Sequence, residues 1–521
     1  MQPEKNVSRL AVLIWFFSVV ASVAVRVSGL HDTSYQWRPL HTELTAYWFV
    51  REGIDLIHYQ TPLFGPPWQI PIEFPLFQAT AAILFQAGLG SFDFACRLTA
   101  LLYFYASALF LYLLCRRMFS DGFTRFVILS LYLWLPFNIH YSTEPLIDYL
   151  ALACALAYFY FILVWLETRS SFWNVLLAAI CGSLGMLVKP TTMPVVLVPI
   201  LVFVLKDILT TYRKNLKPVF DIQGLLKKLW TQRSHWLALM MMAIIPVVLW
   251  SIWTRHADSI KDRSVFTQWH TSQAMVNWYF GSWDLRTDPG VWIRSIDEAE
   301  ELLLPYGLSI FAVLGIFVAA GHIPFPGETT QTRLFILSVL ASLSVILAVF
   351  LSLYQQQYYY ISFSAWMAVL GGYGLARSWQ ISQSKGHTLS LMFAVWAVVF
   401  LAFNMKDHAT LRSLAMSENR KLERSIAKIQ KVQQYIPLDN WVVVVAYDWE
   451  PSYAYWLQRK AMVVTPRELG KPVCQVLADE RFRLVAVADL SYERNEELLD
   501  YAFRCFKSRE EVASGVFVVS H

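Results

Sequence analysis

The sequence predicts an α-helical membrane protein with many spans, followed by a small α/β domain at its C-terminal end. Of its 521 residues, 56% are hydrophobic and only 16% are charged, whereas a soluble domain holds about 25% charged residues. Apolar runs recur up to about residue 405, and the chain after them turns polar. No basic helix or aromatic-basic platform lies in a soluble region, so we expect no nucleic-acid partner.

About eleven apolar runs approach the ~20 residues that a bilayer requires. The first follows a short basic start and is not followed by a small-residue cleavage site, so we expect it to remain as a span. The run 74–88 is short, holds two glutamines and is bounded by Pro and Gly, which favours a helix at the membrane surface. The expected spans are 9–29, 94–116, 123–138, 145–167, 172–187, 190–208, 236–254, 303–322, 333–352, 359–377 and 388–405.

The placement of basic residues predicts the orientation. With a cytoplasmic N-terminus and no crossing at 74–88, the outer loops 139–145 and 353–358 carry no Lys or Arg. A crossing at 74–88 would move the basic segment 206–233 outside, against the positive-inside rule. The inner loops then hold Arg116, Arg117, Arg125, Arg169, Arg377, Lys385 and the segment 206–233.

This topology puts residues 406–521 on the non-cytoplasmic side. They open with a charged helical stretch at 419–436, and then strand-like runs at 441–447 and 483–490 alternate with helix-like segments near 451–458 and 493–503. Cys474 and Cys505 lie in this part, where an oxidising compartment would permit a disulfide; two buried free thiols are the alternative. The other four cysteines lie in or beside apolar helices.

The first outer loop, residues 30–76, holds more titratable groups than a connector between two spans needs. Charges near membrane depth usually face a cavity or a partner. Four further outer stretches carry polar residues: His140, Glu144 and Asp148 in the second, Lys189 in a tight turn, a long loop at 255–302, and YQQQYYY at 354–360. Their gathering on one side of the membrane predicts a site for an anionic amphiphile.

Several segments resemble the GT-C membrane glycosyltransferases, in the branch of lipid A aminoarabinose transferases and protein O-mannosyltransferases (families 39 and 83). The likeness covers residues 1 to about 380 and is carried by order and local pattern. The segments are HTELTAYWFVREG with PIEFPLFQA, CRLTALLY, TEPLIDYLALA, LGMLVKPTTMPVVLVP and QYYYISFSAWMAVLGG. Such enzymes move a sugar from a polyprenyl-phosphate lipid to a lipid, glycan or protein acceptor at the outer membrane face, here expected to be that of a bacterial inner membrane.

The resemblance implies roles for particular residues. Many members carry Asp-Glu in the first loop, where this chain has Arg38 and Pro39, so we expect Glu43 first and Asp32 second as the catalytic base. Glu144 would be a second carboxylate or, with His140, a ligand of a divalent metal such as Mg, Mn or Zn. The residues expected to bind the lipid phosphate or the sugar are Arg38, His41, Glu73, Arg97, Lys189, Tyr358 and Tyr359.

Each residue also has a purely structural explanation. Glu43 and Glu144 suit the starts of helices, Lys189 could reach the headgroups, and Tyr358 and Tyr359 could belong to an aromatic belt. The histidines lack a tight ligand spacing. Competing functions are an oligosaccharide ligase on the same face, a lipid or sugar flippase, and a scaffold. A flippase would favour inverted repeats with charges at mid-membrane, whereas these charges lie at outer helix ends.

Overall fold

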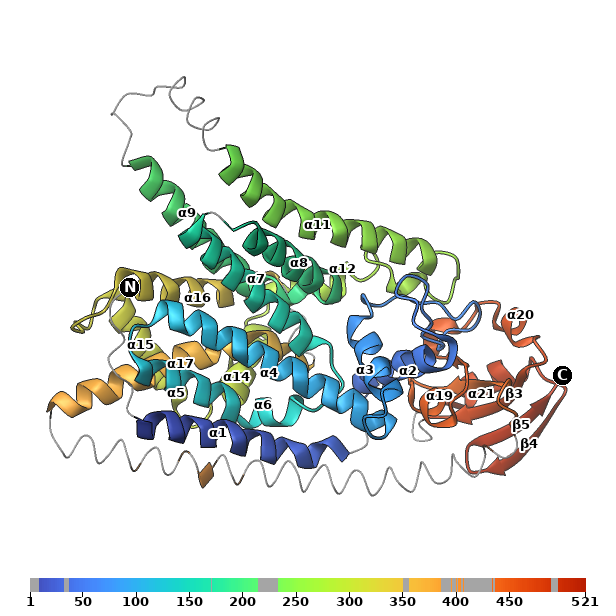
Figure 1. Cartoon of the computed structure of the whole chain (residues 1–521). Helices are drawn as coiled ribbons and strands as arrows, with labels where there is room; N and C mark the ends of the chain where they lie inside the picture. Colours follow the sequence, from blue (N-terminus) through green and yellow to red (C-terminus); the bar gives the residue numbers. More distant parts are fainter. Residues whose placement is uncertain are drawn as a thin grey trace.

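The computed structural model describes residues 9–31, 37–169, 171–213, 233–349, 356–385, 436–488 and 495–521, with a few isolated positions between 395 and 433. The N-terminal part is helical and the C-terminal part is built on a β-sheet. Two short helices, α2 and α3, lie between the helical part and the sheet (Figure 1). Helix α2 lies in the first outer loop predicted above, and α3 in the run expected at the membrane surface.

The described helices of the N-terminal part vary from single turns to 29 residues. They are α1 (Arg9–Val27), η1 (Ser28–His31), α2 (Trp37–Glu52), α3 (Leu76–Gln86), α4 (Phe92–Met118), α5 (Gly122–Trp134), α6 (Pro136–Tyr141), α7 (Asp148–Thr168), α8 (Phe172–Val188), η2 (Pro190–Thr192), α9 (Pro194–Arg213), α11 (Arg233–Lys261), η3 (Gln268–His270), α12 (Val276–Phe280), α13 (Trp283–Thr287), α14 (Pro289–Leu303), α15 (Leu308–Ala320), α16 (Thr330–Val349), η5 (Gln357–Tyr360) and α17 (Ile361–Lys385).

An integral helical membrane protein is confirmed. Within the described residues, four helices are long and apolar enough to cross a bilayer, namely α4, α7, α11 without its first residue, and α16, and the bent pair α14–α15 would make a fifth. The number eleven stays a prediction, and the expected span 388–405 lies almost wholly outside the described residues. The 11-residue α3 covers the run expected at the membrane surface.

Helix α7 occupies the centre of the bundle, since 78% of its apolar window is buried, against 17% for the peripheral α11. Glycines let neighbouring helices approach closely, as is common between membrane helices. A Cβ on Gly374 of α17 would lie 1.7 Å from the carbonyl oxygen of Phe311 in α15. The packing of α15 against α17 therefore depends on this glycine.

Two expected spans differ from the observed helices for local reasons. The run 123–138 is divided into α5 and α6, because Pro136 cannot continue the hydrogen bonding of α5. The run 303–322 begins as a helix only at Leu308, because Tyr306 (φ 59°) and Gly307 (φ 81°) take left-handed conformations. Helices α14 and α15 meet there at 99°.

The C-terminal domain, residues 436–521, is a five-stranded mixed sheet with strand order β2-β1-β3-β5-β4. The predicted strands β1 and β3 and the predicted helices α19 and α21 are confirmed, while β2, β4 and β5 were not predicted. Cys474 and Cys505 form a disulfide. The elements are β1 (Trp441–Val445), α19 (Ser452–Leu457), β2 (Ala461–Val464), η6 (Pro466–Glu468), α20 (Val473–Leu477), β3 (Phe482–Val487), α21 (Asn495–Phe503), β4 (Ser508–Ala513) and β5 (Val516–Ser520).

Candidate active site

Six polar side chains from five segments gather where the first outer loop meets the ends of the bundle helices. We call them the polar cluster: Arg38, Glu73, Asp148, Lys189, Tyr358 and Tyr359. Two links bring their segments together. The N–H of Phe74 donates to the carbonyl of Leu187 (3.2 Å), and the hydroxyls of Thr192 and Ser362 lie 3.0 Å apart. The first outer loop, the turn after α8 and the start of α17 therefore share one region.

The first ion pair of the polar cluster joins helix α2 to the loop before α3. Arg38 Nη2 donates to Glu73 Oε2 at 2.8 Å, and the amide nitrogen of Gln78 donates to Glu73 Oε1 at 2.7 Å. Burial alone would lower the pKa of Arg38, but Glu73, Tyr358 and Asp148 together outweigh it and raise that pKa above its usual value. The guanidinium is therefore a permanent positive charge.

The second ion pair joins α8 to α7. Lys189 Nζ contacts Asp148 Oδ1, and Asp148 is the first residue of α7, where the helix dipole favours a carboxylate. The other oxygen of Asp148, Oδ2, is buried and has no hydrogen-bond partner among the described residues. Asp148 Oδ2 could therefore accept one more hydrogen bond.

Two tyrosines lie next to both ion pairs. The rings of Tyr358 and Tyr359 stack with centroids 4.7 Å apart, and Lys189 Nζ lies 4.1 Å from the ring centroid of Tyr359. Burial and the neighbouring Tyr359 raise the pKa of Tyr358, while the charge of Arg38 acts to lower it. The Tyr358 hydroxyl therefore stays protonated at neutral pH and can donate a hydrogen bond.

Sequence reasoning missed some members of this region. Asp148 was noticed in the second outer loop but was not selected, because nothing in the sequence pairs it with Lys189. Tyr279 of α12 also lies close by. Burial, Tyr359 and Glu73 raise the pKa of Tyr279, while the charge of Arg38 acts to lower it. Tyr279 comes from the long loop 255–302, which has no periodic pattern that could have singled it out.

Arg97 and Glu144 form a separate pair. Arg97 Nη1 donates to Glu144 Oε1 and to the carbonyl of Thr143, both at 3.2 Å, so it ties α4 to the second outer loop. Half-buried His140 has its ring 4.7 Å from that of Tyr141. Within the described ranges, no three His, Cys, Asp or Glu side chains come together as metal ligands. In this part of the chain, the expected metal ligands Glu144 and His140 are therefore not completed by a third His, Cys, Asp or Glu.

The two expected bases occupy different situations. Glu43 is fully buried, and its charge acts on Cys96 of α4 and Tyr455 of α19. Five residues along a helix turn by roughly 140°, so Glu43 leaves α2 on a different face from Arg38. Asp32 lies outside the described residues. The structure thus brings five of the expected binding residues together, namely Arg38, Glu73, Lys189, Tyr358 and Tyr359, but not Glu43.

His41 is enclosed by backbone. Its Nδ1 lies 2.6 Å from the carbonyl of Trp37 and its Nε2 lies 3.0 Å from the carbonyl of Trp449. Burial and the nearby Arg38 lower the pKa of His41 to about 3, so the ring is neutral at physiological pH. A neutral ring has one N–H, so His41 donates to one of these two carbonyls, and the tautomer decides which.

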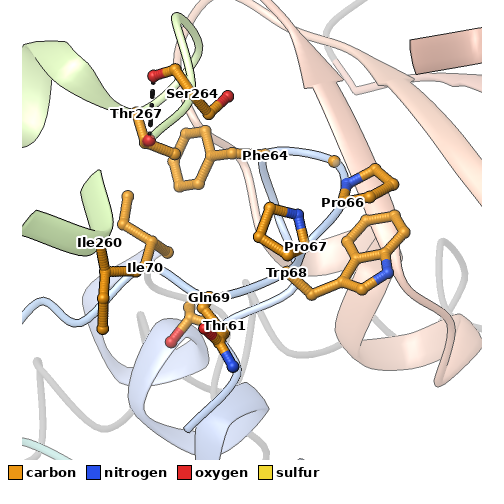
Figure 2. A pocket seen from close by; sticks show the side chains of 11 residues that line it. Thr61, Phe64, Pro66, Pro67, Trp68, Gln69, Ile70, Ile260, Ser264 and Thr267 are labelled. Carbon is orange, nitrogen blue, oxygen red and sulfur yellow. Dashed lines mark hydrogen bonds between the residues drawn. The ribbon is translucent and has the colours of Figure 1, made fainter. Parts of the chain in front are cut away.

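A small hollow lies beside this region, between residues 61–70 of the first outer loop and the end of α11. Figure 2 shows Pro66, Pro67 and Trp68 along one wall, with Ile260 and Thr267 across from them. Its volume is only about 10 Å³, and no member of the polar cluster lines it. A sugar phosphate held by the polar cluster would therefore not occupy this hollow.

Known structures share this architecture. ArnT from Cupriavidus metallidurans bound to undecaprenyl phosphate is 13% identical with a TM-score of 0.64, and 98% of each chain is covered. The archaeal oligosaccharyltransferase AglB from Archaeoglobus fulgidus, in complex with an inhibitory peptide and a dolichol-phosphate, is 12% identical with a TM-score of 0.54. That match covers 98% of this chain and 74% of AglB.

A structure of the A. fulgidus oligosaccharyltransferase with Zn and sulfate is 10% identical with a TM-score of 0.50, over 97% of this chain and 73% of that one. No protein-family model matches the sequence, and no curated protein matches it. ArnT, a lipid A aminoarabinose transferase, and AglB are both GT-C membrane glycosyltransferases. The chain therefore has the GT-C fold that its sequence predicts.

Proposed function

We propose that this protein is a glycosyltransferase that takes a sugar from a polyprenyl-phosphate lipid and transfers it to a lipid, glycan or protein acceptor. The observation that carries the proposal is the polar cluster. Two cations, Arg38 and Lys189, come from different helices and flank the stacked pair Tyr358–Tyr359. Such an arrangement suits one phosphate group that must be recognised by charge and by hydrogen bonds.

The leaving group explains why two cations are needed. The acceptor oxygen or nitrogen attacks the anomeric carbon, the bond from that carbon to the phosphate oxygen breaks, and its electron pair passes to the phosphate. Arg38 and Lys189 stabilise the negative charge that develops there, and the tyrosine hydroxyls donate to the phosphate oxygens. The acceptor attacks from the face opposite the phosphate, so the transfer inverts the anomeric configuration.

A carboxylate must take the proton that the acceptor loses. Asp148 meets one requirement for this base, because its buried Oδ2 has no partner among the described residues and it adjoins the cation Lys189. Glu43 and Asp32 are the alternatives that the sequence suggests, and Glu144 would contribute as a second carboxylate.

We further propose that the site faces the outside of a bacterial inner membrane. The polar cluster lies at the ends of α7 and α17 that are opposite to Arg169 and Arg377. Basic residues gather at cytoplasmic helix ends, which supports an outer position for the cluster and for the C-terminal domain. The transmembrane domain, residues 1–405, would thus carry catalysis, with residues 406–521 resting on its outer face.

An oligosaccharide ligase is the second candidate, favoured by the likeness to AglB over 98% of this chain. Both enzymes would bind a polyprenyl lipid, but the ligase would take a preassembled glycan. Donors that carry one sugar and donors that carry a glycan separate the two, because only the accepted donor releases its lipid carrier.

The direct test is donor-dependent release of polyprenyl phosphate by purified protein, given a panel of undecaprenyl-phosphate sugars and outer-leaflet acceptor lipids. We expect Lys189→Met and Asp148→Asn to lose at least 100-fold in rate, in the range of losing one oxyanion donor. The control is Asp55→Asn, which alters an exposed carboxylate of the same outer loop. Full activity of both cluster variants would contradict the proposal.

The same assay decides the base. Asp32→Asn, Glu43→Gln, Glu144→Gln and Asp148→Asn each keep the shape of the side chain and remove its basicity. The variant of the base should lose transfer while keeping undecaprenyl phosphate binding. If Asp148 is only the partner of Lys189, the loss of rate in Asp148→Asn should come with weaker undecaprenyl phosphate binding. If none of the four lost transfer, the carboxylate-base mechanism would be wrong.

A further inference from the structure

The C-terminal domain shares its hydrophobic core with the first outer loop. Leu40, Leu44 and Trp48 repeat every four residues along α2 and pack against the sheet and α19. On the sheet side, Val442 and Val444 of β1 and Tyr455 of α19 belong to the same cluster. Helix α2, which carries Arg38, is therefore covered by the C-terminal domain along its length.

The same loop also adds a short strand to the edge of the sheet. Ala461 N–H donates to the carbonyl of Pro62 (2.9 Å), and Val463 N–H donates to that of Leu63 (2.8 Å). Phe64 and Met462 form an antiparallel bridge. Two kinds of contact, apolar packing and main-chain hydrogen bonding, therefore fix the domain on the loop.

The loop after β1 contacts the first outer loop and the loop 255–302 through Trp449. The ring of Trp449 lies 4.1 Å from that of His41 and 5.1 Å from that of His270, between centroids. Trp269 and Phe64 complete this aromatic group, each 5.8 Å from Trp449. Three segments that are remote in sequence, the first outer loop, the loop 255–302 and the C-terminal domain, meet at Trp449.

His41 links this aromatic group to the first turn of α2. It lies three residues after Arg38, and its ring is held between two carbonyls, that of Trp37 in the first helical turn and that of Trp449 in the domain. In the tautomer with the proton on Nε2, the neutral ring donates its one N–H to the Trp449 carbonyl. The first N–H groups of an α-helix have no intrahelical partner, so contacts from outside help to hold its first turn. The contact to Trp449 is therefore an external restraint on the turn that carries Arg38.

We infer that the C-terminal domain is a working part of the active site: Trp449, through His41, sets the position of Arg38 against Glu73 and the tyrosine pair. The inference rests on the proposed function, and it makes His41 and Trp449 positioning residues. A displacement of about 1 Å in a group that binds the reacting phosphate can cost about 100-fold in rate.

The test compares two variants that each remove one hydrogen bond between α2 and the C-terminal domain. His41→Phe keeps a ring against Trp449 and loses both carbonyl contacts. Tyr47→Phe loses the hydrogen bond from Tyr47 to Gln458 (3.1 Å). Tyr47 lies about two and a half turns of α2 after Arg38. We expect His41→Phe to weaken undecaprenyl phosphate binding and to lower kcat/KM for the donor at least tenfold, and Tyr47→Phe to change both less than twofold.

Two further measurements separate positioning from folding. Protection of the Ala461 and Val463 amides from hydrogen exchange reports whether the domain stays in place. His41→Gln, which restores a donor, should recover part of the lost activity. Trp449→Ala keeps the carbonyl that faces His41 but removes the ring that packs against it. Because the two residues are in direct contact, the effect of Trp449→Ala and that of His41→Phe should not add.

Equal effects of His41→Phe and Tyr47→Phe, or additive effects of the two site variants, would overturn the inference. If amide exchange shows that His41→Phe is unfolded, Trp449→Ala takes its place. Undecaprenyl phosphate binding and kcat/KM for the donor are then compared between Trp449→Ala and Tyr47→Phe. The proposed function fails differently, since the unaltered protein would then neither bind undecaprenyl phosphate nor release it from a donor.

Discussion

Acidification should detach the C-terminal domain from the first outer loop. His41 and His270 lie at this junction, 2% and 6% exposed. Burial and Arg38 lower the pKa of His41 to about 3, and burial followed by Lys261 lowers that of His270 to about 3. Both rings are neutral in place, so a proton binds more readily once the domain has moved away. The contribution of the two neutral histidines to the stability of this junction is therefore fully present above a pH of about 6.5 and is lost as the pH falls toward 3.

The size of the effect follows from the two pKa values. A histidine that moves from about 3 in place to about 6.5 in water loses about 2 kcal/mol between pH 7 and pH 5. Two such residues set an upper limit of about 4 kcal/mol, because detachment hydrates each ring only in part. Half of the contribution of one histidine, about 1 kcal/mol, already corresponds to about a fivefold change in the fraction of molecules with the domain detached.

Hydrogen exchange measures this directly. The amides of Ala461 and Val463 donate across the junction, whereas that of Val442 donates to Lys460 inside the domain. After correction for intrinsic rates, we expect protection of the first two amides to fall at least fivefold from pH 7 to pH 5, and that of Val442 to persist. His41→Phe combined with His270→Phe should abolish this pH dependence. Unchanged protection at pH 5, or unchanged pH dependence in the double variant, would refute the reasoning.

Other predictions concern the bundle, the disulfide and metals. Gly374→Val should prevent stable insertion or lower the melting temperature strongly, because its Cβ would overlap the Phe311 carbonyl; an unchanged melting curve would contradict the packing of α15 on α17. Replacing Cys474 and Cys505 by Ser should cost the C-terminal domain about 3 kcal/mol in urea, as expected for a loop of 31 residues, and a change below 1 kcal/mol would speak against the cross-link. Adding EDTA should leave undecaprenyl phosphate binding unchanged, since Arg38 and Lys189 supply the positive charge; loss that Zn or Mg restores would show that a metal takes part.

The sequence predicted the helical membrane fold and the first outer loop, because composition and the positions of charges carry that information. It also predicted that Arg38, Glu73, Lys189, Tyr358 and Tyr359 belong to one site, since the topology brings outer helix ends together. The sequence did not predict which of these charged residues form ion pairs. Arg38 and Glu73 are 35 residues apart, and Asp148 and Lys189 are 41 apart, with no periodic pattern relating either pair.

The docking of the C-terminal domain was even harder to predict from the sequence. His41 and Trp449 are 408 residues apart, and their hydrogen bond uses a main-chain oxygen that any residue would provide. Strand β2 is only four residues long, and its outer edge pairs with a loop that reads as irregular. Contacts of this kind depend on tertiary packing alone, so local propensity and spacing do not reveal them.

The central claim is that Arg38 and Lys189 hold a polyprenyl phosphate. Photolabelling with a polyprenyl phosphate that carries a photoreactive group near the phosphate tests it without knowledge of the sugar or the acceptor. We predict labelling of α2, the turn at 189–193 and η5, blocked by excess undecaprenyl phosphate but not by undecaprenol, and lost in Lys189→Met. Labelling spread over the lipid-facing helices, with equal competition by the alcohol, would contradict the claim.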